Sequence, residues 1–260
     1  MRRILLSFVA SLSGSLFLMT AQPSTAEEAP VYELRIYTTN EGKLDDLLTR
    51  FRDHTCRLFE KHGITNIGYW VPVHQEDGAS NTLIYVISHK SREAAKASWA
   101  GFIADPDWKS AQKASEANGK ILAKKPESIF MAATDYSPAI QTGVESPERT
   151  FILRTYIAAE GKLPALHARF RDHTVALFSK HGMGHVGYWE PTDSESGAGT
   201  KLIYILAVPS EEAGQASFGT FRDDPEWKKV KEVSEADGSL TAPKGVTGVY
   251  MKPVDFSPIR

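Results

Sequence analysis

The chain has 260 residues, with 30 basic and 32 acidic side chains, a formal net charge of −2 and 42% hydrophobic residues. These values are ordinary for a water-soluble globular protein and suffice for one large or two small domains. The near-neutral charge argues against a broad basic surface for nucleic acid, and the single cysteine, Cys56, excludes a disulfide framework or a cysteine metal site.

The first residues differ in character from the rest. Arg2 and Arg3 precede an apolar run from Ile4 to Met19, and Ser24-Thr25-Ala26 offers the small residues that a signal peptidase reads. We therefore interpret residues 1–26 as a secretory signal peptide, which would make the protein exported, either periplasmic in a bacterium or extracellular. An uncleaved membrane anchor is the alternative, but the run is short and serine-rich for a span of about 20 apolar residues. No stable membrane span is expected after cleavage.

The next hundred residues alternate between strand-like and helix-like periodicity. Val31 to Thr38 has period two, Ser91 is a helix cap, and Asp105-Pro106 begins a further helix. The predicted order is β-α-β-β-α-β with the second helix broken in two, which is the ferredoxin-like unit of an α+β protein. The predicted elements are strand 31–38, helix 43–62, strands 67–73 and 82–88, helices 91–102 and 105–119, and strand 128–132.

The same pattern recurs 119 residues later. By direct comparison, 43 of the 89 positions from 31 to 119 are identical to their partners, and the run Phe51 to Thr55 returns unchanged as Phe170 to Thr174. The protein is therefore a tandem duplication. We predict a signal peptide at 1–26, a first unit at 27–138, a linker at 139–148 and a second unit at 149–260. In the second unit the predicted elements include strand 151–157, helix 162–181, strand 200–208, a helix capped by Asp224 and strand 248–252.

The two units are expected to pair. A ferredoxin-like sheet has helices on one face only, so its other face needs a cover. Two such sheets could close into a barrel, as a pseudo-dimer within one chain. In the first strand we expect Leu34 and Ile36 to face the helices, which would place Arg35 and Tyr37 inside the barrel, together with Arg154 and Tyr156.

The unit resembles the NIPSNAP family of the dimeric α+β barrel superfamily. The carrying residues are Tyr32 to Tyr37, Gly42, His62-Gly63, Gly68-Tyr69-Trp70, Trp99 and Phe102 to Trp108. The second half departs at Thr150-Phe151-Ile152 and at Phe218, which stands in place of Trp99. The resemblance implies paired ferredoxin-like units. The superfamily includes cofactor-free oxygenases, haem enzymes and proteins without known activity, so the resemblance implies no particular reaction.

Arg35 and Arg154 are the leading candidates for a ligand-binding site. A buried guanidinium needs a partner, which could be a ligand anion or carbonyl, or a structural acid such as Glu33, Asp53 or Asp172. Only Glu33 lacks an acidic repeat partner, because Ile152 stands there. We therefore expect Arg35 to be paired within the protein and Arg154 to be free for a ligand.

The other candidates have both functional and structural interpretations. Tyr37 and Tyr156 could hydrogen-bond a ligand or fill the barrel. Trp70 and Trp189 could form a ligand wall or pack the core. His54 and His173 could act as a general base or a haem ligand, or could be satisfied boundary residues. No residue spacing suggests a dedicated metal site, and no cofactor is predicted, with haem as a minor alternative.

The favoured hypothesis is an exported tandem barrel that binds a small hydrophobic or carbonyl-bearing molecule, with oxygenase-like activity as one extension. The rival is a non-enzymatic interaction or scaffold protein, and a haem enzyme comes third. A pocket lined by Arg35, Tyr37 and Trp70 would favour ligand binding, whereas a filled barrel with an exposed apolar patch would favour the scaffold. The sequence leaves open whether the protein is an enzyme.

Overall fold

The computed structural model describes residues 29–143 and 148–260. The expected signal peptide, residues 1–26, lies outside the described residues, as do positions 144–147 of the expected linker. Within the two described ranges, no helix has the length and apolar character needed to cross a membrane.

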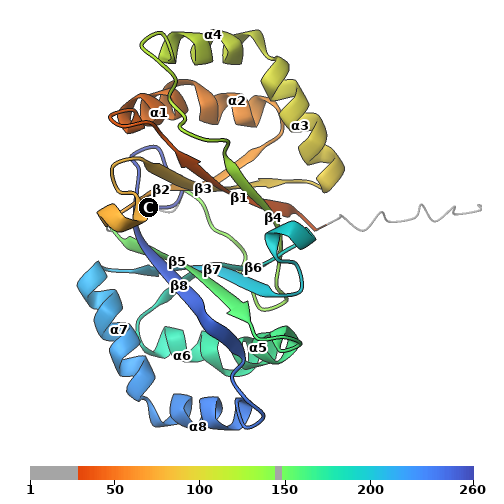
Figure 1. The fold of residues 1–260 in the computed structure, drawn as a ribbon, viewed down its shortest axis with the longest axis vertical. Helices are drawn as coiled ribbons and strands as arrows, with labels where there is room; N and C mark the ends of the chain where they lie inside the picture. The colour runs from red at the N-terminus through yellow and green to blue at the C-terminus, as the bar shows by residue number, and fades with distance from the viewer. Residues whose placement is uncertain (1–28, 144–147) are drawn as a thin grey trace, which may run out of the picture.

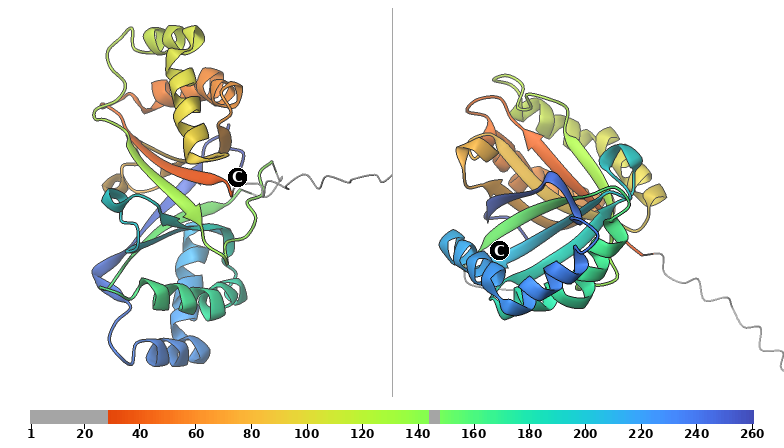
Figure 2. Two further views of the ribbon diagram at one scale, coloured as in Figure 1. Left: turned by 90° about the vertical axis from the view of Figure 1, so that its right-hand side faces the viewer. Right: turned by 60° about the horizontal axis from the view of Figure 1, so that its bottom comes forward.

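Eight antiparallel strands close into a barrel in the order β1-β3-β2-β8-β5-β7-β6-β4. The helices of the first repeat cover one side of the barrel and those of the second repeat cover the opposite side (Figures 1 and 2). The predicted pseudo-dimeric α+β barrel of two ferredoxin-like units is therefore confirmed.

The elements of the two repeats correspond one to one. The first repeat contains β1 (Val31–Thr38), α1 (Leu44–Arg50), η1 (Phe51–Thr55), α2 (Cys56–Lys61), β2 (Thr65–Pro72), η2 (Gln75–Asp77), β3 (Thr82–His89), α3 (Arg92–Ala104), α4 (Pro106–Ser115) and β4 (Glu127–Ala133). The second contains β5 (Thr150–Ala158), α5 (Leu163–Arg169), η3 (Phe170–Thr174), α6 (Val175–Lys180), β6 (Gly184–Pro191), η4 (Ser194–Ser196), β7 (Lys201–Val208), α7 (Glu211–Asp223), α8 (Pro225–Ser234) and β8 (Thr241–Pro253).

Most local predictions hold, with two differences. The Ser91 hydroxyl caps α3 and the Asp105 carboxylate caps α4, as their positions indicated. The first helix of each repeat carries one π turn, η1 or η3, formed by the repeated Phe-Arg-Asp-His-Thr run. Strand β8 is far longer than predicted, because it pairs with β5 along most of its length and then with β2.

Each repeat contributes its last strand to the other. Strand β4 pairs with β6 of the second repeat, and β8 pairs with β2 of the first. A short arm then follows each strand: Asp135-Tyr136-Ser137-Pro138 after β4 and Asp255-Phe256-Ser257-Pro258 after β8.

These two arms are fastened by equivalent contacts. Arg171 binds Asp135 through two hydrogen bonds of 2.7 and 2.8 Å, and Arg52 binds Asp255 at 2.9 and 2.8 Å. In addition, the backbone N–H of Tyr188 donates to Ser137, and that of Tyr69 donates to Ser257, in both cases at 2.9 Å. The repeated Phe-Arg-Asp-His-Thr run thus supplies the arginine that holds the arm of the other repeat.

Two further ion pairs cross between the repeats, at equivalent positions but with opposite polarity. Arg92 at the start of α3 lies 3.2 Å from Asp193. His74 lies 2.8 Å from Glu211 at the start of α7. Positions 74 and 193 are repeat partners, as are 92 and 211, so acid and base have exchanged places.

The barrel interior is filled with apolar side chains. One buried cluster draws on all eight strands, with Leu34, Trp70, Met131, Phe151, Trp189 and Met251 among its members. Leu34 and the partly buried Ile36 belong to this interior, whereas Tyr37 packs beneath α1 and η1. The predicted facing of the first strand was therefore wrong. Both faces of a closed barrel sheet are covered. Alternation therefore showed that the strand has two faces, but not which face points into the barrel and which points to the helices.

The Gly-Tyr-Trp run has a packing reason in both repeats. Trp70 folds back over Gly68 inside the barrel, and Trp189 does the same over Gly187. A Cβ atom on Gly68 would lie 2.3 Å from the Trp70 ring, and one on Gly187 would lie 2.4 Å from the Trp189 ring. Each glycine therefore leaves the space that its tryptophan fills.

We predict that Gly68→Ala lowers the free energy of unfolding by about 1–3 kcal/mol, the usual effect of overfilling a packed core. Gly219→Ala on α7 is the matched control, because nothing lies within 4 Å of its added Cβ. Alanine there favours the helix by about 0.5–1 kcal/mol. Urea unfolding curves of both variants test this, and equal stability of the two would contradict the packing role of Gly68.

Candidate functional site

The first repeat holds a buried polar network between its sheet and helix α3. Glu33 is 1% exposed and accepts hydrogen bonds from four side chains. They are Arg35 at 2.5 Å, Ser128 at 2.6 Å, Trp99 at 2.8 Å and His89 at 3.0 Å. Burial alone would raise the pKa of Glu33. The hydrogen bond with His89, the charge of Arg35 and the bonds from Ser128 and Trp99 outweigh burial and lower that pKa to about 2.

Glu33 and the other three side chains that donate to it are all replaced in the second repeat. Ile152, Val208, Phe218 and Gly248 stand where the first repeat has Glu33, His89, Trp99 and Ser128. Arg154 nevertheless remains, half-buried, and no carboxylate of the described residues forms an ion pair with it. The predicted asymmetry is therefore present: Arg35 is paired with Glu33, whereas Arg154 has no acidic partner.

The surroundings of Arg154 are aromatic. Its guanidinium lies 5.0 Å from the ring centre of Phe218 and 5.6 Å from that of Tyr156. The Nε atom of Arg154 and the hydroxyl of Tyr204 are buried without a geometric hydrogen-bond partner. A Cβ on Gly248 would lie 2.5 Å from the guanidinium, so glycine at this position makes room for it. A guanidinium that has tyrosine hydroxyls and no acid beside it can donate hydrogen bonds to a carboxylate or carbonyl oxygen.

The predicted grouping of arginine, tyrosine and tryptophan does not form. Arg35 and Tyr37 lie on the helix side of the sheet, where Arg35 donates to the Tyr37 hydroxyl at 3.3 Å. Trp70 and Trp189 lie on the opposite side, inside the barrel, and both are 0% exposed. The tryptophans are therefore packing residues, and Arg35 and Arg154 occupy separate layers instead of meeting inside the barrel.

His54 and His173 lie at the surface. Both project from the π turns and are exposed, which differs from the expected boundary position. A haem needs an enclosed apolar slot, and two exposed histidines on the outer helices do not fit that requirement. Within residues 29–143 and 148–260, no group of three or more His, Cys, Asp or Glu side chains could hold a metal ion.

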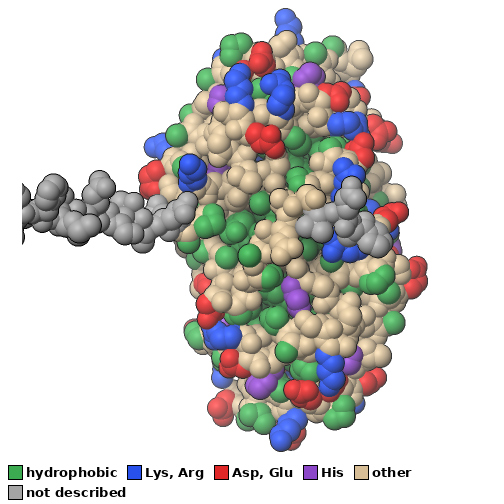
Figure 3. Space-filling view, turned by 180° about the vertical axis from the view of Figure 1, so that it is seen from behind, with side chains coloured by type: hydrophobic (Ala, Val, Ile, Leu, Met, Phe, Trp, Pro, Cys, Tyr) green, Lys and Arg blue, Asp and Glu red, His purple; other side chains and the backbone are tan. Residues whose placement is uncertain are grey.

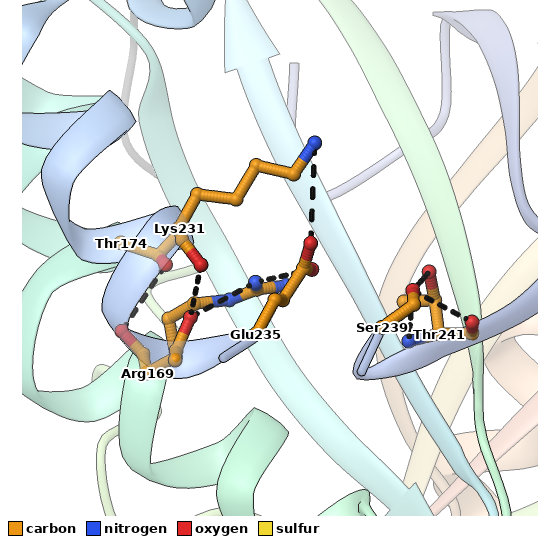
Figure 4. A network of polar contacts seen from close by, with 7 residues as sticks. Arg169, Thr174, Lys231, Glu235, Ser239 and Thr241 are labelled. Carbon is orange, nitrogen blue, oxygen red and sulfur yellow. Dashed lines mark hydrogen bonds and ion pairs between the residues drawn. The ribbon is translucent and has the colours of Figure 1, made fainter. Parts of the chain in front are cut away.

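His173 borders an open groove between α5, η3 and α8, with a volume of about 560 Å³. Its walls include the apolar side chains of Ala168, Val230 and Val233. At its base Arg169 donates to Glu235 at 2.8 Å and its carbonyl accepts from Thr174, as Figure 4 shows. On the face shown in Figure 3, acidic and basic side chains are interspersed, and hydrophobic side chains gather near the waist between the repeats.

A second cavity contains polar residues that the sequence reasoning did not single out. It lies where the arm after β4 crosses α5, and His167 and Glu190 line it. Their repeat partners are Leu48 and Val71. Comparing the repeats for positions where one is polar and the other apolar would have identified these two residues.

The family and structural comparisons agree with this architecture. The NIPSNAP family model matches residues 32–138 and 151–258. A proposed monooxygenase from Fusobacterium nucleatum is similar over 89% of this chain and 98% of its own, with a TM-score of 0.57 and 12% identity. An anthrone oxidase-like protein covers 89% of this chain and 94% of its own, with a TM-score of 0.56 and 14% identity.

A NIPSNAP-family protein of unknown function from Agrobacterium tumefaciens is 24% identical over 45% of this chain and 97% of its own, with a TM-score of 0.37. The monooxygenase-like and anthrone oxidase-like proteins, with TM-scores above 0.5, share the fold of this chain, and identities of 12% and 14% leave activity open. No functionally curated protein matches the sequence.

The Glu33 network predicts a pH-dependent stability. The folded pKa of about 2 lies below the ordinary value of 4.5, so the stabilising contribution is complete above 4.5 and disappears as the pH falls toward 2. The shift corresponds to about 3 kcal/mol. In urea unfolding, the free energy of unfolding of wild type should exceed that of Glu33→Gln near neutral pH. This difference should narrow as the pH falls from about 4.5 to about 2. The exposed Glu41→Gln should show no such narrowing, and a constant gap for Glu33→Gln would refute the network's charge.

Proposed function

The chain belongs to the NIPSNAP family, and we propose that its second repeat binds a small apolar molecule through a carboxylate or carbonyl group. Arg154 is the clamp, and Tyr156, Tyr204 and Phe218 surround the bound group. The observation that carries this proposal is that the half-buried Arg154 has no acidic partner, because Ile152 stands where the first repeat has Glu33.

A purely structural role explains Arg154 poorly. Burying a guanidinium without an acid costs free energy, and an apolar residue of similar size would pack there at no such cost. The first repeat shows how the same fold neutralises this charge internally through Glu33. In the second repeat, an anionic or strongly accepting ligand would supply the missing partner.

Oxygenase-like activity is the reaction to test on such a ligand. Two proteins of the same fold are named as a proposed monooxygenase and an anthrone oxidase-like protein. The similarity is one of fold, so it guides the choice of assay and identifies no catalytic residue.

A non-enzymatic interaction protein is the second candidate. The filled barrel interior supports it, because no ligand chamber is needed to explain those side chains. The groove beside α8 also supports it, since Val233 there is 69% exposed.

The two arginines distinguish these functions. We expect Arg35→Met to lower the free energy of unfolding by about 3 kcal/mol, because Glu33 loses its charged partner in the interior. Arg154→Met should leave stability equal or higher, because it removes an unpaired buried charge. Thermal melts of both variants provide the measurement. Equal, large destabilisation by both would return both arginines to a structural role.

Ligand binding is tested with phenylacetate, an apolar carboxylate, and with 2-phenylethanol as its neutral counterpart. Calorimetric titration should show phenylacetate binding to wild type and to Arg35→Met, the latter measured below its melting range. Arg154→Met should not bind phenylacetate. Binding that survives Arg154→Met, or equal binding of the alcohol, would contradict the clamp.

We also propose that the protein is exported and that residues 1–26 are removed on export. The basic start, the apolar run and the small residues before position 27 support this. Intact mass spectrometry of protein from its native host should give a chain beginning at Glu27. A mass that includes residues 1–26 would contradict cleavage.

A further inference from the structure

The cavity beneath the arm that follows β4 has the features of a separate binding site. It has a volume of about 560 Å³ and is formed by the arm, by α5 and η3, by the end of β6 and by the loop at Gly199. None of the residues that line this cavity belongs to the group around Arg154, which is Tyr156, Tyr204 and Phe218. The two sites can therefore be tested independently.

Its polar groups are only partly satisfied by the protein. Asp135 is fully engaged by Arg171 through two hydrogen bonds. Glu190 accepts from the backbone of Gly199 through one oxygen, and its other oxygen lies 3.4 Å from Nε2 of His167. Among the described residues, the Thr134 hydroxyl is buried without a hydrogen-bond partner, and this approach of Glu190 is the one contact of Nε2, too poorly aligned to count as a good hydrogen bond. Buried polar atoms are normally paired, so these poorly paired atoms indicate an occupant of the cavity.

The polar residues are not required by the fold. Tyr136, which lies 2.8 Å from Nδ1 of His167, has Phe256 as its repeat partner. His167 and Glu190 have Leu48 and Val71. The arm after β8 is fastened just as firmly over this apolar set as the arm after β4 is over the polar one. Closing the barrel therefore does not require the polar residues Tyr136, His167 and Glu190.

The charges decide what kind of group fits. The ion pair of Asp135 and Arg171 is internally neutral, which leaves the carboxylate of Glu190 as the unbalanced charge. An additional anion would face that carboxylate with no free guanidinium to offset it. Burial lowers the pKa of His167, which keeps its ring neutral near pH 7 and able to accept at one nitrogen.

In one tautomer the Tyr136 hydroxyl donates to Nδ1 of His167, and Nε2–H points to Glu190. In the other, Nδ1 donates to the Tyr136 oxygen, and Nε2 presents a lone pair beside the Glu190 carboxylate. A cationic donor between the two residues selects the second tautomer. Two acceptors side by side require a cationic donor with several hydrogens, which describes a primary ammonium group. We propose that this cavity binds a primary amine in its ammonium form, with Glu190 and Nε2 of His167 as acceptors. Its hydrocarbon chain lies against Leu163 and Pro164.

The test is a calorimetric titration of the full mature chain with n-butylammonium chloride at pH 8. Saturable binding at one site per chain is expected. Tetramethylammonium chloride at equal ionic strength carries the same charge without N–H donors and should not bind. Glu190→Gln should weaken n-butylammonium binding about tenfold or more, the effect of losing a charged hydrogen bond. The control is Glu160→Gln, which removes one negative charge at an exposed position next to α5. This variant should bind n-butylammonium as tightly as wild type does.

A second variant separates the site from folding. Tyr136→Phe combined with His167→Leu copies the apolar residues of the other arm, so it should fold and no longer bind n-butylammonium. Binding by wild type should also weaken in acid as His167 becomes protonated, at a pH below the ordinary histidine range because burial lowers its pKa. The other ionisable groups that face it are Glu190, Asp135, Arg171 and Tyr136. In Glu190→Gln, titration of the Glu190 carboxylate no longer contributes to the pH dependence of n-butylammonium binding.

The amine could belong to a free metabolite or to a lysine side chain, and a blocked Gly-Lys-Gly peptide distinguishes the two. Tighter binding of the peptide than of n-butylammonium would identify a protein lysine, and the reverse would identify a small amine. Absence of any saturable binding, binding of tetramethylammonium, or an unchanged affinity in Glu190→Gln would overturn the proposal. Phenylacetate binding at Arg154 is unaffected by all of these variants.

Discussion

The pairing of each repeat's last strand with the other repeat is the constraint on which the rest of the structure depends. Without β8, the first repeat has an unpaired edge at β2, and without β4 the second has one at β6. Closing the barrel removes both edges and buries the apolar faces of both sheets in one interior. The arms that follow these strands are then brought over the helices of the other repeat. Arg52 and Arg171 hold them there through Asp255 and Asp135.

This arrangement separates what the duplication keeps from what it changes. The interior is nearly symmetric, with Trp70 and Trp189 over equivalent glycines. The differences are concentrated outside the barrel, between sheet and helices and beneath the arms. There the first repeat holds the Glu33 network and the second holds an unpaired Arg154 and the His167–Glu190 pair. Substitutions in these layers leave the barrel intact, so each could acquire its own polar chemistry at little cost in stability.

The sequence predicted the elements, the duplication and the paired barrel, because hydrophobic period, helix caps and a 119-residue repeat are all local signals. The Glu33–Ile152 difference also predicted correctly which arginine is paired. Alternation alone could not predict on which side of the sheet Arg35 and Tyr37 lie. The neighbouring strand β3 is buried on both faces, so it does not show which face is covered by helices. His167, Glu190 and Tyr136 come from three separate elements, so only the folded chain brings them together. The arms were missed because each is only four residues long, too short to show a strand or helix period.

The reversed ion pairs at the waist have a consequence for encounters between copies of this chain. Within one molecule, Arg92 meets Asp193 and His74 meets Glu211. Were the first repeats of two molecules to associate in the same geometry, His74 would face Arg92, and two second repeats would set Asp193 against Glu211. Both mismatched assemblies place like charges together, whereas the native pairing places unlike charges together. These charges thus disfavour pairing between two first repeats or two second repeats of different molecules. They favour pairing of a first repeat with a second repeat, as occurs within one chain.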